Sequence, residues 1–330
     1  KRHWTEDDIR RRATFALRCA EANGTVAVRT HLDTGHVSTD HVYAVMRELR
    51  YEWKDRITLQ FVSLCGVEDY GGPEGEALAD LPVRHGASAI GGMPRMNPDL
   101  PAQLDRLMRL ADEREVGLDL HVDENGDPSA QCLREVAKAV QRNGFRHPVA
   151  CGHACSLAVL HPTDREETLE RVAGSGIGVI SLPLCNLYLQ DRADPAETAS
   201  TPRWRGITLI REWMERNVPV ACASDNVRDA FYAYGDYDMF EVYLQSLRIG
   251  HLDAVLARSP EVVTTAPAKL MGLPDHGRIA PGAPARFVRF PATTFSELLS
   301  RPASERTHWN GAGWEIRPAP PYSDLDPHTR

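Results

Sequence analysis

Two short segments of the sequence combine side chains that could activate a water molecule. The segment VGLDLHVDE carries His121 with Glu124 three residues later, and the segment ACASDN carries Asp225. An imidazole is a ready ligand for a divalent metal ion, and a carboxylate just beyond it could carry a proton. Asp225 could bind the metal and deprotonate its water. The alternatives are a structural role for His121 and a helix N-cap for Asp225.

Other histidines and an aromatic run are further candidates. His153 ends the segment PVACGH, where the alternative is a core histidine. The two cysteines that flank it suggest a structural zinc site, but no second cysteine pair with suitable spacing completes one. His31 in VRTHLD is either a residue of the site or a structural partner of Asp33. Phe231, followed by two tyrosines, could stack on a flat ring or pack within its loop.

These candidates follow short apolar segments that alternate with amphipathic helices. The first helix begins after Thr5, which can cap it, and ends before Gly24. Buried strands are expected at 26–30, 57–64, 87–92, 117–122, 149–152, 177–183 and 218–223. Apolar strands separated by helices predict a parallel sheet covered on both faces, which is an open doubly wound sheet or a (β/α)₈ barrel. Because the candidates follow several different strands, and a barrel brings all strand ends to one mouth, we expect the barrel.

The predicted barrel has seven strands and begins with a helix, so we expect its first βα unit to precede Lys1. The barrel is assigned to residues 1–278, ending after a helical stretch at 261–272. Residues 279–330 are rich in glycine, proline and short β-like runs, which predicts a small C-terminal β appendage, the remnant of a β-sandwich, and a tail. The Pro-rich stretch 317–321 of that tail is expected to be poorly ordered.

Composition limits the partners of the protein. The chain has 330 residues, a net charge of −8 and no basic stripe, which argues against binding nucleic acid through its phosphates. No apolar run is long enough to span a membrane. Seven scattered cysteines favour a reducing compartment, so the protein is expected in the cytoplasm. A small molecule is the expected partner. The sequence leaves open whether the protein forms a homo-oligomer.

The chain resembles the cytosine deaminase branch of the amidohydrolase superfamily, which also includes enzymes that remove amines from s-triazine rings. The stretches that carry the resemblance are VRTHLD, LHVDE, CGH at 151–153, PLCNLYLQDR, RGIT, ASDNVRDAFYAYGDYDM and APAKLMGLPDHGRIAPGAPA. They span nearly the whole chain. The resemblance implies a metal-dependent hydrolytic deaminase that acts on a small cyclic amidine, such as a cytosine-like pyrimidine or an aminotriazine, through metal-activated water.

The resemblance also assigns roles to single residues. It implies that His121 and Asp225 bind one divalent ion, Zn or Fe, and that Asp225 is also the base. Glu124 would shuttle protons to the ring nitrogen and the leaving amine, and His153 would orient the attacking water. Phe231 would stack on the ring.

Three departures from the family bear on the substrate and the metal. The family's first strand carries an H-x-H pair of metal ligands, and the 330 residues contain no such pair, so we expect it upstream of Lys1. The glutamine that reads the pyrimidine edge aligns with Gly66, which makes cytosine a doubtful substrate. Asn226 stands where a second aspartate is frequent and offers a donor as well as an acceptor.

Three other functions stay open from the sequence. A hydrolase of a cyclic amide could use the same residues. A barrel that binds a heterocycle without catalysis would fit a chain that lacked H-x-H altogether. A phosphate-binding barrel enzyme would need a glycine-rich loop late in the barrel, where this chain has ASDNVRDAF. It is the least supported of the three alternatives.

Overall fold

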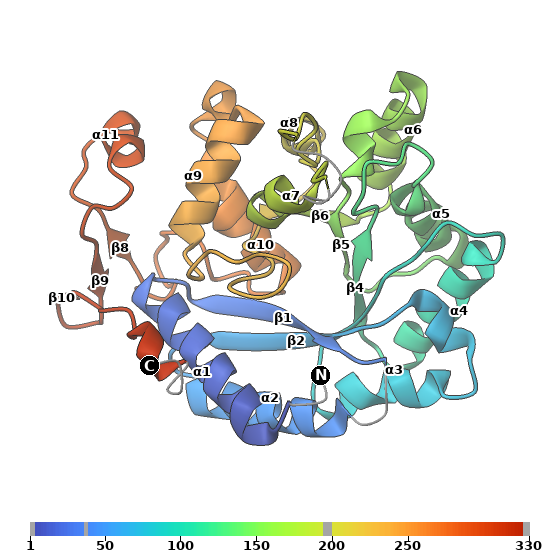
Figure 1. The fold of residues 1–330 in the computed structure, drawn as a ribbon, viewed down its shortest axis with the longest axis horizontal. Coiled ribbons are helices and arrows are strands. Elements are labelled where there is room, and N and C mark those ends of the chain that lie inside the picture. The colour runs from blue at the N-terminus through green and yellow to red at the C-terminus, as the bar shows by residue number, and fades with distance from the viewer. Residues whose placement is uncertain (1–3, 36–38, 194–199, 326–330) are drawn as a thin grey trace.

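Seven parallel strands follow one another around the computed structural model, which describes residues 4–35, 39–193 and 200–325 (Figure 1). The strands are β1 (Ala27–Asp33), β2 (Thr58–Leu64), β3 (Ala89–Gly92), β4 (Gly117–Val122), β5 (Val149–His153), β6 (Gly178–Ser181) and β7 (Val220–Cys222). β1 pairs with β2, and β3 to β7 pair in chain order. A single parallel bridge between Gly66 and Met93 joins the two sheets just beyond β2 and β3. Every strand therefore points the same way, as a barrel requires.

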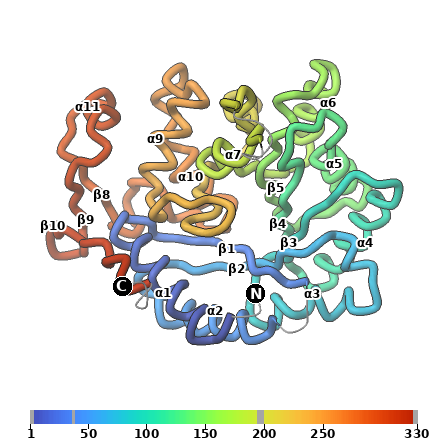
Figure 2. The backbone as a smooth tube through the Cα atoms, viewed as in Figure 1, coloured from blue at the N-terminus to red at the C-terminus, as the bar shows by residue number. Residues whose placement is uncertain are grey.

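Helices separate the strands and cover their outer faces (Figures 1 and 2). They are α1 (Glu6–Ala22), α2 (Asp40–Trp53), α3 (Gly75–Arg84), α4 (Leu100–Glu113), α5 (Cys132–Asn143), α6 (Pro162–Ala173), α7 (Pro183–Leu189), α8 (Ile210–Glu215), α9 (Met239–Gly250) and α10 (Thr265–Leu270). Thr5 caps α1 by accepting a hydrogen bond from the backbone of Asp8, as the sequence predicts. The helical stretch predicted at 261–272 is a 3₁₀ turn (Ser259–Val263) followed by α10.

Two apolar cores lie between the helices and the strands. The larger core packs β3 to β7 against helices α4, α5 and α6, with Leu104 and Val136 fully buried. The smaller core packs α1 and α2 onto β1 and β2 around Tyr43 and Leu49. Burying one apolar stripe of each helix against near-continuous apolar strands stabilises this arrangement. The strands thereby become a rigid support for residues at their carboxyl ends.

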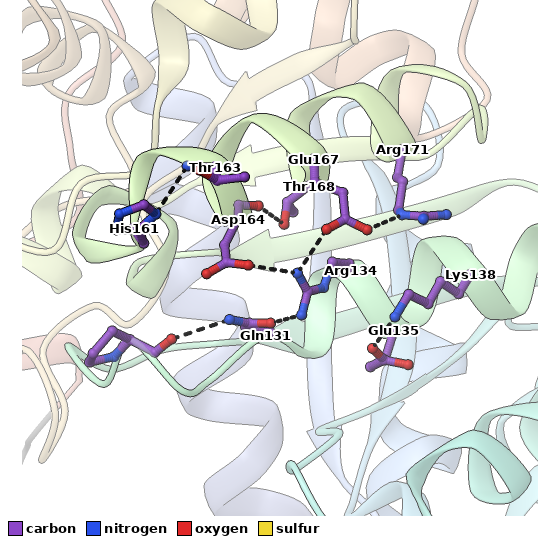
Figure 3. A network of polar contacts seen from close by, with 11 residues as sticks. Gln131, Arg134, Glu135, Lys138, His161, Thr163, Asp164, Glu167, Thr168 and Arg171 are labelled. Carbon is purple, nitrogen blue, oxygen red and sulfur yellow. Dashed lines mark hydrogen bonds and ion pairs between the residues drawn. The ribbon is translucent and has the colours of Figure 1, made fainter.

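Neighbouring helices are also tied by polar contacts on the outside of the barrel. Arg134 of α5 lies 3.3 Å from the carboxylates of Asp164 and Glu167, both on α6 (Figure 3). Arg134 also donates to Gln131, and Glu167 accepts from Arg171. This network lies on the helical layer and fixes α5 against α6.

The C-terminal part forms a three-stranded antiparallel sheet in the order β10–β9–β8. Its strands are β8 (Val288–Arg289), β9 (Thr307–Trp309) and β10 (Trp314–Glu315), with α11 (Phe295–Ser300) between the first two. The domain boundary at 278/279 stays a prediction. The expectation that 317–321 is poorly ordered is wrong, because Pro320 is buried and the next turn packs on α1, where Tyr322 contacts Phe15 and Arg18 pairs with Asp324.

The strand assignments made from sequence agree with the structure to within a few residues. β1 runs three residues beyond its predicted end, and β3, β6 and β7 are shorter than the apolar runs that contain them. None of the helices formed by the described residues is long and apolar enough to cross a membrane.

Candidate active site

The carboxyl ends of three strands bring the predicted catalytic residues together. His121 is near the end of β4, His153 is the last residue of β5, and Asp225 follows β7 by three residues. The strand register pairs His121 with Gly152, so the two histidines lie on adjacent strands at nearly the same height. Parallel strands therefore place these side chains at one mouth, as the sequence predicts.

The backbone is strained at two of these positions. His153 has φ of 72° and Asp225 has φ of 63°, both in the left-handed region that non-glycine residues rarely adopt. Such conformations cost of order 1–3 kcal/mol each and persist only where the surroundings hold them. Asp225 is not a helix N-cap, because the next helix, α9, begins at Met239 and is capped by Asp238. The structural alternative for Asp225 is therefore wrong.

A chain of short polar contacts links four side chains of the site. Nε2 of His153 lies 3.3 Å from Nδ1 of His121, and the two rings are 4.8 Å apart. Nδ1 of His153 lies 3.3 Å from Oε1 of Glu124. The side-chain amide of Asn186, on α7, donates to that same Oε1 and lies 3.2 Å from Nδ1 of His153. His153 is only 1% exposed, so its position is set by these contacts.

Two groups of potential metal ligands share Glu124. The first comprises His121, Glu124 and His153, and the second comprises Glu124, Cys185 and Asp225, with ligand atoms within 4.8 Å of one another in each. Oδ2 of Asp225 is buried and has no hydrogen-bond partner among the described residues. A buried carboxylate oxygen without a partner is costly unless something else satisfies it. A divalent cation is a suitable partner, so this donor set fits a metal ion.

Burial shifts the pKa values of these residues toward their neutral forms. Desolvation, reinforced by the charge of Asp225, raises the pKa of Glu124 to about 7, although the Asn186 hydrogen bond opposes this. Burial also raises the pKa of Asp225. Burial, with the charge of His31, lowers the pKa of His153 to about 3 and that of His121 well below its usual value. A carboxylic acid that titrates near neutral pH can donate and accept a proton during turnover.

A buried ion-pair network lies beneath the site, inside the barrel. Asp119, on β4 two residues before His121, accepts a 2.9 Å bond from Arg29 and lies 3.2 Å from Nε2 of His31. The ring of His31 packs edge-on against the ring of His121 at 4.4 Å. The sequence left open whether His31 is a residue of the site or a structural partner of Asp33. The structure shows that its ring contacts the site residue His121 and that its side chain also pairs with Asp119.

The predicted substrate-binding residues lie in segments that follow the carboxyl ends of β2 and β7. Gly66 follows β2 and begins the 3₁₀ turn η2 (Val67–Gly71). Asn226 donates to Asp229 and lies 3.7 Å from the thiol of Cys185. Phe231 is 60% exposed in the loop before α9. Their roles in binding stay predictions.

Sequence reasoning named no role for several residues that the structure places at the site. Asn186 and Cys185 belong to the stretch PLCNLYLQDR, which marked the family resemblance but not a function. Gln190, in the same stretch, donates to the backbone oxygen of Glu124. Trp204 packs its ring onto Gly126, where an added Cβ would lie 2.8 Å from the ring. Helix α7 therefore positions Glu124 from one side, and Trp204 covers the loop that follows it.

Comparison with known proteins agrees with this geometry. Residues 7–309 match the profile of the family described as "Amidohydrolase family". A pterin deaminase from Rhizobium rhizogenes (strain K84) is 45% identical over 326 residues, which is 98% of this chain and 73% of that protein. The chain belongs to the amidohydrolase family. Its predicted resemblance to this superfamily is therefore confirmed.

Solved structures of the same superfamily share the fold. The 5-methylcytosine deaminase of Klebsiella pneumoniae bound to 5-fluorocytosine superposes with a TM-score of 0.84 at 26% identity, covering 96% of this chain and 76% of that one. N-isopropylammelide isopropylaminohydrolase of Burkholderia multivorans ATCC 17616 superposes with a TM-score of 0.74 at 26% identity, covering 93% of this chain and 75% of that one. The TIM-barrel type of fold is thus confirmed, as is the cytosine deaminase-like branch.

These relatives are all deaminases or aminohydrolases. The protein is a hydrolytic deaminase that acts on carbon–nitrogen bonds of small cyclic heterocycles. A barrel that binds a heterocycle without catalysis is therefore not its function. The family is generally metal-dependent, and the two ligand groups around Glu124 are suited to a metal ion.

Proposed function

We propose that the protein removes the exocyclic amine of a bicyclic amino-oxo heterocycle of the pterin class. The observation that carries this proposal is the 45% identity with a pterin deaminase across 98% of the chain. The site supports it, because carboxylate oxygens of Glu124, whose pKa is about 7, and of Asp225 lie within 4.8 Å of each other at one mouth. The amidine unit of a pterin, an amine on a carbon between two ring nitrogens, is a substrate for this chemistry.

Each of the four central residues has a proposed task. Glu124 carries a proton to the ring nitrogen as water attacks, and then to the departing amine, since its pKa of about 7 allows both forms at neutral pH. Asp225, whose pKa burial raises, accepts the proton of the attacking water. His153 is held neutral and orients that water, while Asn186 fixes His153 and Glu124 relative to each other.

His121 and Asp225 are proposed to hold one divalent ion, Zn or Fe. When bound, such an ion would lower the pKa of a water molecule to about 7 and make it a nucleophile at neutral pH. Catalytic zinc sites use about three protein ligands, which is more than these two residues provide. We therefore propose that the remaining ligands, an H-x-H pair, come from a part of the protein outside Lys1–Arg330.

The strand pairing supports that proposal. Within the described part of the chain, β1 pairs only with β2 and β7 pairs only with β6. Both strands offer an unpaired edge to a further parallel strand. Metal analysis of the full gene product should find about one divalent ion per chain, and a gene product without an H-x-H pair would contradict the ligand assignment.

The cellular setting follows from the cysteines. All seven are free and buried. Unpaired cysteines are typical of a reducing compartment, which supports a cytoplasmic location.

The substrate is tested by ammonia release from pterin, cytosine and an aminotriazine, measured as kcat/KM on full-length, metal-loaded protein. We expect pterin to exceed cytosine by about ten-fold or more, the scale on which one mismatched polar contact discriminates. Glu124→Gln protein, purified in parallel, controls for a contaminating deaminase. Cytosine as the best substrate by a similar factor would contradict the proposal.

A further inference from the structure

Gly66 faces the inside of the barrel. Gln60 of β2 accepts a 2.9 Å hydrogen bond from Arg29, which also binds Asp119 in the barrel interior. Side chains alternate between the two faces of a strand, so the residues an even number of positions beyond Gln60 share its inward face. The chain is still extended at Gly66, with φ of −65° and ψ of 143°. A side chain at position 66 would therefore point into the mouth.

Gly66 also lies at the height of the metal-ligand candidate His121. It bridges Met93, and Gly91, two residues before Met93, pairs with Asp119, two residues before His121. Gly66, Met93 and His121 thus form one layer across three neighbouring strands. With about 4.8 Å between adjacent strands, Gly66 lies about 10 Å from His121 along the wall. That span exceeds a single six-membered ring and suits a bicyclic ring with a substituent.

The space over Gly66 is not empty. A Cβ atom added to Gly66 would lie 2.6 Å from Cδ of Glu68 and 2.7 Å from each of its carboxylate oxygens. The absence of a side chain at position 66 therefore leaves no open space, because the Glu68 carboxylate fills it. Glu68 reaches back from the turn η2, whose geometry is fixed by a 3.0 Å bond from the backbone of Gly66 to Asp69.

The carboxylate of Glu68 is available to a ligand. It is exposed, and within the described residues it has no hydrogen-bond or ion-pair partner. Two neighbouring acidic residues are placed differently from Glu68. Glu74 lies at the start of α3, and the carboxylate of Asp69 accepts a hydrogen bond from the backbone of Gly66. An ionised carboxylate accepts hydrogen bonds but donates none.

We propose that Glu68 is a specificity-determining residue that contacts the end of the substrate farthest from the reacting carbon. This rests on the proposed action on pterins. Its carboxylate accepts a hydrogen bond from a ring N–H or a hydroxyl substituent on the second ring. The carboxylate disfavours a substituent that is itself an anion, because two negative charges in contact repel each other. Position 66 must be glycine for the carboxylate to occupy this place.

Two substrates that differ only at the far end test the proposal. These are 6-hydroxymethylpterin, whose hydroxyl can donate, and pterin-6-carboxylate, which carries a negative charge. For the wild-type full-length protein, we expect kcat/KM to favour the hydroxymethyl compound by about ten-fold or more. Glu68→Gln should bring this ratio close to one, and Gly66→Ala should reduce it because its Cβ displaces the Glu68 carboxylate. Glu74→Gln, which removes the same charge nearby, is the matched control.

The outcomes separate the two proposals. If the wild-type protein turns over neither pterin, the proposed function is wrong and the inference fails with it. If it turns over pterins but Glu68→Gln leaves the ratio unchanged, only the assignment of Glu68 is wrong. A change of equal size in Glu74→Gln would also overturn that assignment, because it would show a general effect of surface charge. Thermal unfolding of each variant checks that the substitutions leave the fold intact.

Discussion

The side-chain amide of Asn186 donates a 3.2 Å hydrogen bond to Oε1 of Glu124. The same amide nitrogen lies 3.2 Å from Nδ1 of His153, which is itself 3.3 Å from that carboxylate oxygen. One amide on α7 therefore sets the spacing between the proposed proton carrier on the loop after β4 and the histidine at the end of β5. It also stabilises the ionised form of Glu124 against the burial that favours the neutral form.

Asn186→Leu should shift the pH dependence of the reaction. Loss of a donor to the carboxylate raises the pKa of Glu124 above about 7, because the ionised form loses a hydrogen bond. The alkaline limb of the kcat/KM profile should then move to higher pH, and the maximum should fall by about ten-fold or more as the two groups lose their alignment. Gln190→Ala, which removes a bond only to the backbone oxygen of Glu124, should leave the limb in place. An unshifted limb in Asn186→Leu would contradict the role of this amide.

Glu124→Gln keeps the size of the side chain but removes the transferable proton. We expect kcat to fall by about two orders of magnitude or more, the usual contribution of general acid–base catalysis. Metal content should stay normal, because Glu124 is not proposed as a ligand. Elemental analysis and turnover of the same preparation provide both measurements. Loss of the metal, or near-normal turnover, would show that the role is misassigned.

Asp225→Asn should abolish activity on every substrate, because it disables the base common to all of them. It should also weaken metal binding, since the buried Oδ2 of Asp225 lacks another partner among the described residues. A chelator competition measures the metal affinity independently of turnover. Asp253→Asn, an exposed aspartate in the turn after α9, should change neither quantity. Retained activity on any one substrate in Asp225→Asn would refute the assignment.

Asp119→Asn should destabilise the fold through the ion pair beneath the site. It leaves Arg29, whose side chain is only 12% exposed, without its counter-charge, and breaking a buried pair costs about 3–5 kcal/mol in the free energy of unfolding. Asp112→Asn is the control, because Asp112 is 69% exposed and its contact with His147 is on the surface.

The destabilisation should depend on pH in a defined direction. Burial raises the pKa of Asp119, but His31 and Arg29 outweigh it and lower the value to about 2, below the ordinary value of 3.8. Because the folded-state pKa is the lower one, this stabilisation is fully present above about pH 4 and is lost as pH falls toward 2. Denaturant unfolding at pH 7 and pH 3 should therefore show a smaller difference between wild type and Asp119→Asn at pH 3. An equal difference at pH 7 and pH 3 would mean that the destabilisation does not come from loss of the Asp119 charge.

The amino-acid sequence is sufficient to predict the order of the elements and the strand ends that carry the chemistry. Seven apolar runs separated by amphipathic helices predicted β1 to β7, since burial on both faces requires such runs. A histidine or carboxylate directly after such a run lies at the mouth in any parallel barrel. The sequence alone therefore identifies four candidate site residues, which are His121, Glu124, His153 and Asp225.

Which other side chains contact these four residues depends on how distant segments of the chain pack together. Asn186 is 62 residues from Glu124, and Arg29 is 90 residues from Asp119, so no local spacing predicts either contact. Position 66 shows the same limit. A glycine in the sequence indicates free space, but whether a neighbour fills that space depends on how the next turn folds back. There the structure places the carboxylate of Glu68, because the bond between Gly66 and Asp69 closes the turn that carries it.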